Sequence, residues 1–93
     1  MRPKPLTSEQ IRAGRALLRW RARDLARHSA VGVATIRRAE LLDGPTVMTA
    51  ANDLAIRRVL EEAGVEFIDE SESSGPGVRL QKPVTSEANK ERD

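Results

Sequence analysis

The sequence contains no cysteine or tyrosine, and it has one histidine, one tryptophan and one phenylalanine among 93 residues. Without cysteine, the chain has neither a disulfide nor a thiolate metal site. A single histidine limits acid–base catalysis, and no Ser-His-Asp or paired-carboxylate arrangement is identifiable. These absences predict a protein that is not an enzyme and that uses no metal and no cofactor.

Long apolar runs are missing as well. No stretch approaches the roughly 20 apolar residues that a membrane span needs. The basic residues at the N-terminus precede no apolar segment of the kind found in signal peptides. The sequence therefore predicts a cytoplasmic protein without a membrane partner, and its length predicts one small domain with a small core.

Charge is distributed unevenly, although the net charge is only +2. Residues 1–40 carry ten basic and three acidic side chains, a net charge of +7, whereas residues 41–93 carry six basic and eleven acidic ones, a net charge of −5. Nine of the ten basic residues in the first part are arginine, whose planar fork matches phosphates and guanine edges. A solvated charged surface is the alternative, but the asymmetry favours nucleic acid as the partner of the first half.

Local patterns predict four helices between residues 8 and 64. Thr7 and Gln10 form a capping box before the first helix, which runs to about Arg19, and Leu6 and Ile11 close over it as a hydrophobic staple. Short helices are expected at 20–30 and 33–41, with a break at 31–32. A turn at 43–45 precedes a fourth helix that begins between residues 49 and 52 and ends at Gly64, a left-handed C′ position. The residues expected to face inward are Ile11, Gly14, Leu17, Leu18, Leu25, Ala26, Ile36, Ala39, Ile56, Val59, Leu60 and Ala63.

A β-hairpin is expected after Gly64, with strands at 65–68 and 78–80 and a long, mobile, polar loop between them. Val65, Phe67, Val78 and Leu80 form one apolar face of this hairpin, which needs a partner because a lone hairpin is marginal in water. The fourth helix of the same chain would cover this face, or the equivalent strand of a second chain would. The second alternative is favoured and predicts a homodimer with these four residues at its interface.

The two ends of the chain are expected to lie outside the folded domain of residues 6–82. Two prolines exclude regular structure from residues 1–5, which we expect to form a flexible basic arm. Residues 83–93 contain Val84 and Ala88 as their only apolar side chains besides a proline, which predicts a disordered tail.

Two short helices, a break and a third helix have the layout of a helix-turn-helix. The segment 20–40 resembles the Cro/repressor-type (XRE) helix-turn-helix family at Leu25, Ala26, Val31, Ile36 and Glu40. Residues 60–68 and 75–80 are similar to a compact bacterial subgroup with a C-terminal Gly-Val-Glu-Phe-Ile … Gly-Pro-Gly-Val-Arg-Leu hairpin. The resemblance covers about residues 6–82. It implies a mainly α, lambda-repressor-like bundle of about four helices followed by a short β-hairpin.

The resemblance also implies a nucleoid-associated transcriptional repressor that binds double-stranded DNA at a pseudo-palindromic operator. Helix 33–41 would lie in the major groove. Base contacts are expected at Val33, Ala34 and Arg38, of which only Arg38 can donate hydrogen bonds to a guanine. Contacts to the DNA backbone are expected at Arg21, Ala22, Arg23, Thr35 and Arg37.

The sequence departs from the family pattern around the turn. Arg21 and Ala22 stand where the family often has a capping Ser or Thr and a Gln, Ala30 stands where it often has Gly, and Gly32 replaces a Ser or Thr cap. The start of the recognition helix therefore lacks hydrogen-bonding side chains. This leaves open a second function, a protein-interaction module on the same fold, antiactivator or antitoxin-like, with little or no DNA binding.

Overall fold

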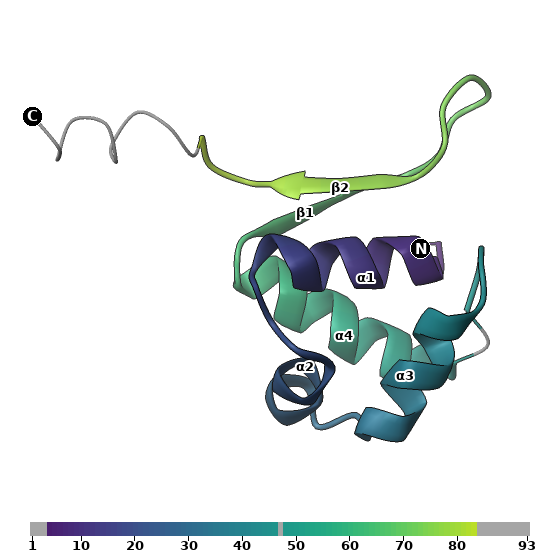
Figure 1. The fold of residues 1–93 in the computed structure, drawn as a ribbon. Helices are drawn as coiled ribbons and strands as arrows, with labels where there is room; N and C mark the ends of the chain where they lie inside the picture. The colour runs from purple at the N-terminus through teal and green to yellow at the C-terminus, as the bar shows by residue number, and fades with distance from the viewer. Residues whose placement is uncertain (1–3, 47, 84–93) are drawn as a thin grey trace, which may run out of the picture.

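The computed structural model describes residues 4–46 and 48–83, which form four helices followed by an antiparallel hairpin (Figure 1). The hairpin lies across α1 and α4, and α2 and α3 lie at the opposite end of the molecule. Most of the predicted arm and tail, residues 1–3 and 84–93, lie outside the described residues. The elements are α1 (Ser8–Leu17), α2 (Ala22–Ser29), α3 (Val33–Leu41), α4 (Ala50–Glu62), β1 (Val65–Ile68) and β2 (Gly77–Leu80).

Helix α1 begins with the predicted capping box. The Thr7 hydroxyl accepts the Gln10 backbone N–H at 3.1 Å, and Gln10 Oε1 accepts the Thr7 N–H at 3.0 Å. Leu6 and Ile11, the predicted staple, are both fully buried. The predicted end at Arg19 is wrong by two residues, because Arg19 adopts a left-handed φ of 57° that turns the chain out of the helix.

The remaining helices follow the predicted order with small changes at their ends. Helix α2 is shorter than the predicted 20–30, because Arg21 is its N-cap and Ala30 has a left-handed φ of 60°. Helix α3 has the predicted bounds. Helix α4 begins after Thr49, whose hydroxyl accepts the Asn52 N–H at 3.1 Å, and Gly64 follows it with a φ of 113°, as predicted. None of the helices in the described part of the chain is long and apolar enough to span a membrane.

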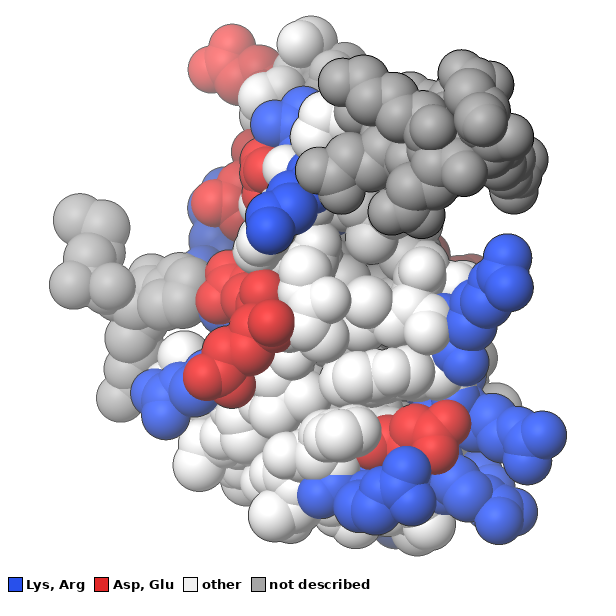
Figure 2. Space-filling model, turned by 90° about the vertical axis from the view of Figure 1, so that its left-hand side faces the viewer, with Lys and Arg blue, Asp and Glu red and all other residues white. Residues whose placement is uncertain are grey.

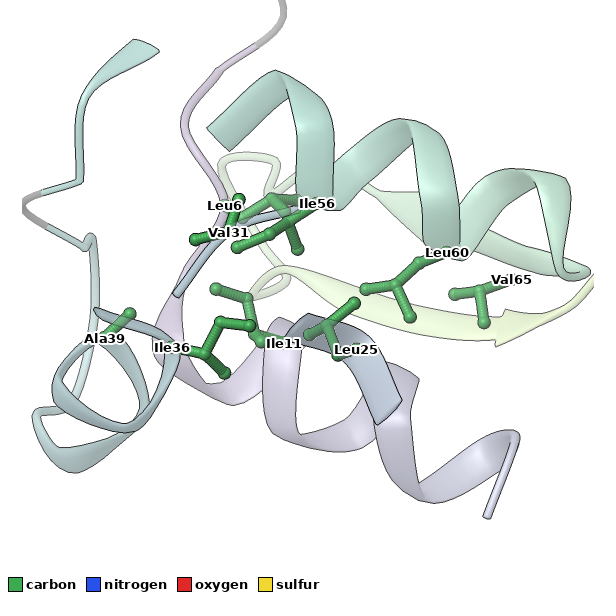
Figure 3. Close-up of a cluster of buried hydrophobic side chains, with 9 residues drawn as sticks. All are labelled: Leu6, Ile11, Leu25, Val31, Ile36, Ala39, Ile56, Leu60 and Val65. Atoms are coloured by element: carbon green, nitrogen blue, oxygen red, sulfur yellow. The ribbon is translucent and has the colours of Figure 1, made fainter. Parts of the chain in front are cut away.

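A single core joins the four helices to the hairpin. Figure 3 shows its side chains converging from the helices and from β1. Full burial of a large aliphatic side chain contributes roughly 1.5–3 kcal/mol. The inward predictions for Leu17 and Ala63 are wrong, because both lie at the C-terminal ends of their helices and are exposed. The core residues are Leu6, Ile11, Leu25, Val31, Ile36, Ala39, Ile56, Leu60 and Val65.

Close contacts and buried polar side chains fix α1 against the later elements. Gly14 has no side chain at the contact with α4, where a Cβ would lie 3.4 Å from a methyl group of Leu60. Gln10, which is 4% exposed, donates from Nε2 to the carbonyl oxygens of Ile68 and Gly77 at 3.2 Å each. The hairpin is therefore tied to α1 by hydrogen bonds as well as by apolar packing.

The apolar face of the hairpin packs on helices of its own chain. Val65 is fully buried in the core, and Phe67 and Val78 pack against it. Strand β1 contacts α4, and β2 contacts α1. Val65, Phe67 and Val78 are therefore covered by helices of their own chain and not by a second chain, which corrects the predicted interface at these three positions, while the homodimer itself stays a prediction. The alternative, cover by the fourth helix, is correct for β1.

Candidate nucleic-acid interface

The turn between α2 and α3 is held by short-range hydrogen bonds. Ser29 Oγ donates to the Leu25 carbonyl at 2.7 Å and accepts the Val31 N–H at 3.2 Å. Ala30 turns the chain in the left-handed conformation, and Val31 is buried. Gly32 then caps α3 with no side-chain hydrogen bond to its first turn. The relative orientation of the two helices is therefore fixed by a turn of three residues and by one buried valine.

Helix α3 turns Ile36 and Ala39 into the core. Its other faces carry the residues predicted to contact bases, of which Ala34 and Arg38 are exposed and Val33 is half-buried. Ala34 and Arg38 are four residues apart and thus lie on one face of the helix. Arg38 Nη2 lies 3.4 Å from Thr35 Oγ1, a weak contact that leaves most of the guanidinium donors free. The structure therefore brings the predicted base-contact residues together on the solvent side of α3.

The residues predicted to contact the DNA backbone are divided by burial. Arg21, Arg23 and Arg37 are exposed, and Thr35 is half-buried. The methyl group of Ala22 packs against the core, so that only its backbone N–H, in the first turn of α2, can face a phosphate. The predicted backbone contact at Ala22 stays a prediction, restricted to its main-chain N–H.

Two arginines of the basic first half are used inside the protein. Arg15 donates to both carboxylate oxygens of Glu40, at 2.8 and 2.7 Å, and to the Trp20 carbonyl at 2.9 Å. The hydrogen bonds and charge of Glu40 raise the pKa of Arg15 above its ordinary value. Arg12 donates to the Glu40 carbonyl and lies 3.9 Å from Asp43. These two arginines therefore anchor α3 to α1 and are not free to bind a ligand, although the +7 of residues 1–40 already counts the charge of Glu40.

The exposed positive charge is concentrated around α2 and α3. The segment 19–38 contains six arginines, all exposed, and one acidic residue, Asp24. Asp24 accepts the Arg21 N–H at 2.8 Å and pairs with Arg27 at 3.1 Å, so its charge is used locally. Figure 2 shows Lys and Arg side chains gathered at the bottom of this face, at the level of α2 in Figure 1, and Asp and Glu on its left side. We call the six arginines the arginine surface: Arg19, Arg21, Arg23, Arg27, Arg37 and Arg38.

Sequence reasoning missed an aromatic stack beside this surface. The rings of Trp20 and His28 are 4.5 Å apart at their centroids and only 12° from parallel. Trp20 is half-buried against the core, while His28 is exposed. The stack fixes the segment after α1 to the last turn of α2. No sequence pattern signals it, because the pair depends on the left-handed turn at Arg19.

Two leucines at the end of α3 were also missed. Leu41 is 78% exposed and Leu42 is 62% exposed, the largest values among the exposed large apolar residues. Leu41 is the last residue of α3, Leu42 is its C-cap, and the acidic Asp43 follows.

Comparison of the chain with models of protein families finds no match, and comparison with curated proteins finds none either.

Proposed function

We propose that this chain is a sequence-specific DNA-binding transcriptional regulator, a repressor with a lambda-repressor-like helix-turn-helix. The observation that carries the proposal is the arginine surface, six exposed arginines around an α3 whose outer face is open. Arginines that neutralise phosphates release counterions from DNA, which supplies most of the sequence-independent affinity. An acidic partner surface on a protein would not require this density of arginine on two adjacent helices.

In this proposal α3 lies in the major groove with its N-terminal half toward the bases. Arg38 donates two hydrogen bonds to O6 and N7 of a guanine, while Val33 and Ala34 contact thymine methyl groups. Thr35 lies beside Arg38 and contacts the backbone. Base recognition thus depends mainly on one arginine, which makes the specificity of a single α3 low.

Phosphate contacts come from the two sides of the groove. Arg21 and Arg23 at the start of α2 bind one strand together with the Ala22 backbone N–H, since a helix N-terminus favours anions. Arg37 binds the other side from α3. These contacts position α3 but carry no direct sequence information.

A regulator with so small a reading surface works as a homodimer on a pseudo-palindromic operator, because two half-sites double the number of bases read. We place it in the cytoplasm, associated with the nucleoid. It acts by binding alone, without catalysis or a cofactor.

The test is a selection of bound sequences from random duplexes, followed by titration of the selected duplex and an unrelated one. Arg38→Ala should weaken binding to the selected duplex by about 5- to 150-fold, the equivalent of one bidentate base contact, and change binding to the unrelated duplex much less. Arg58→Ala is the matched control, because Arg58 is an exposed arginine on α4, outside the arginine surface. Equal losses for Arg38→Ala on both duplexes would make Arg38 a phosphate contact.

A second function, a protein-interaction module, is favoured by the exposure of Leu41 and Leu42 next to α3. Such a module would bind its protein partner through these leucines and would show no sequence preference on DNA. Replacement of both leucines by serine separates the two functions. In a DNA-binding regulator it leaves the affinity of a single half-site unchanged, whereas in an interaction module the selection itself yields no enriched sequence.

A further inference from the structure

Strand β2 forms one edge of the two-stranded sheet, and its outer hydrogen-bonding groups are unpaired. The Gln81 N–H donates to the Gly64 carbonyl at 2.9 Å, across a register in which Val65 faces Leu80 and Phe67 faces Val78. In an antiparallel ladder this bond makes Val65–Leu80 and Phe67–Val78 the non-hydrogen-bonded pairs. The backbone N–H and C=O of Val78 and Leu80 therefore point away from β1. Between residues 4–46 and 48–83 these four groups have no hydrogen-bond partner.

We propose that a second copy of the chain pairs with this edge, β2 against β2, about a two-fold axis. Val78 then lies opposite Leu80 of the second copy, and the four outward groups of each strand form four interchain hydrogen bonds. The result is a continuous four-stranded sheet in the order β1-β2-β2-β1. This deepens the proposed function by naming the interface of the regulator dimer. The role of the dimer in DNA binding rests on the proposed function, whereas the strand pairing itself does not.

The charges along the edge suit this pairing. Arg79 lies on the axis, opposite its own copy, where two like charges would repel. Its guanidinium is held by Glu66 Oε2, at 3.1 Å from Nε and 2.7 Å from Nη2, which neutralises it within each chain. The same edge has no other charged residue between Gly77 and Leu80. The repulsion between the two Arg79 side chains at the axis is therefore offset by the Glu66 carboxylate of each chain.

The symmetry also suits two half-sites. A two-fold axis between antiparallel edge strands is perpendicular to the sheet, so that the helices of both copies lie on the same side of it. Helices α2 and α3 are at the end of the molecule opposite the hairpin (Figure 1). Both arginine surfaces then face the same direction, as reading of a pseudo-palindrome requires.

The edge of β1 is less suited to this role. The Val65 carbonyl already accepts Nε2 of Gln81 at 3.1 Å, so the β1 edge begins with an occupied acceptor. The Phe67 ring is covered by the Arg57 guanidinium, whose central carbon lies 5.1 Å from the ring centroid. The β2 edge offers two consecutive outward residues with all four groups free.

The test is sedimentation equilibrium of the full chain without DNA at micromolar concentration. We expect a dimer. Arg58→Glu, a change of charge on exposed α4 away from the β2 edge, should leave it unchanged.

A backbone variant tests the strand pairing itself. Val78→Pro removes an outward N–H while leaving the ladder to β1 intact, since edge strands accept proline at such positions. It should give a monomer with an unchanged circular dichroism spectrum. A chain that is monomeric throughout, or a dimer that tolerates Val78→Pro, would overturn the proposal. A β2-dependent dimer that binds no DNA would overturn the proposed function but support this interface. A monomer that binds one half-site tightly would overturn this interface but support DNA binding.

Discussion

Replacing Glu40 by glutamine removes the negative charge that Arg15 binds while keeping the size of the side chain. The two carboxylate oxygens accept at 2.7 and 2.8 Å, and the Glu40 side chain is only 9% exposed. In the variant one of these acceptors becomes an NH₂ group that faces an arginine donor. The ion pair between α1 and the C-terminal half of α3 is then lost, while the Arg12 hydrogen bond to the residue-40 carbonyl remains.

The loss of unfolding free energy caused by Glu40→Gln lies between two limits. Breaking a fully buried ion pair costs about 3–5 kcal/mol, and an exposed pair contributes about 0–1 kcal/mol. The Arg15 side chain is 22% exposed and keeps its hydrogen bond to the Trp20 carbonyl, so it is not left without a partner. We therefore expect Glu40→Gln to lower the free energy of unfolding by about 2 kcal/mol, or the melting temperature by roughly 8–16 °C for a domain of this size.

Chemical denaturation of four variants measures this effect. Asp43→Asn is the matched control, because Asp43 is 92% exposed and 3.9 Å from Arg12, and it should change stability by less than about 0.5 kcal/mol. Arg15→Gln and the double variant complete a cycle that isolates the coupling of the pair. If Glu40→Gln costs no more than Asp43→Asn, the pair does not hold α3, and the reasoning that removes Arg15 from the DNA-binding charge fails.

Three further predictions follow from single residues. Ala30→Gly should stabilise the fold by about 0.5–1 kcal/mol, because relief of a left-handed alanine exceeds the extra entropy of an unfolded glycine; Ala16→Gly, at an exposed position inside α1, should destabilise by a similar amount in the same thermal melts. The hydrogen bond from the Gly44 N–H lowers the pKa of Glu9 below its ordinary value of 4.5, so the stability it contributes is present above pH 4.5 and is lost as the pH falls through the lowered pKa. Glu9→Gln should therefore remove this contribution at neutral pH, change stability little at low pH, and so flatten the acid side of the stability profile; an unaltered acid limb would contradict this. Arg37→Ala should weaken binding to every duplex alike and make the log–log salt dependence shallower by about 0.9, and a loss confined to one sequence would instead assign Arg37 to a base.

Local features of the fold were predictable because short-range interactions decide them. The capping box of Thr7 and Gln10, the break before α3 and the left-handed Gly64 all depend on neighbours within four residues. The spacing of apolar residues changes after Gly64 from that of a helix to the alternation of a strand. This change identified the hairpin for a similar reason, since strand and turn residues differ in their preferred backbone conformations.

Features that depend on distant residues were not predictable. The pairing of Arg15 with Glu40 joins positions 25 residues apart, and a helical projection only showed that Arg12 and Arg15 share a face. The hairpin face was assigned to a second chain because the sequence does not show that α1 lies beneath β2. The exposure of Leu17 and Ala63 has the same origin, since the helical period continues to the end of a helix whereas its packing partner does not.

The salt dependence of DNA binding by the intact chain tests the arginine surface most directly. Of its six arginines, Arg27 is paired with Asp24, Arg38 is assigned to a base, and Arg21, Arg23 and Arg37 are assigned to phosphates. Three phosphate contacts predict a log–log slope of about −2.7 per chain on the selected duplex. A slope near zero, together with equal affinity for unrelated sequences, would contradict DNA binding through this surface.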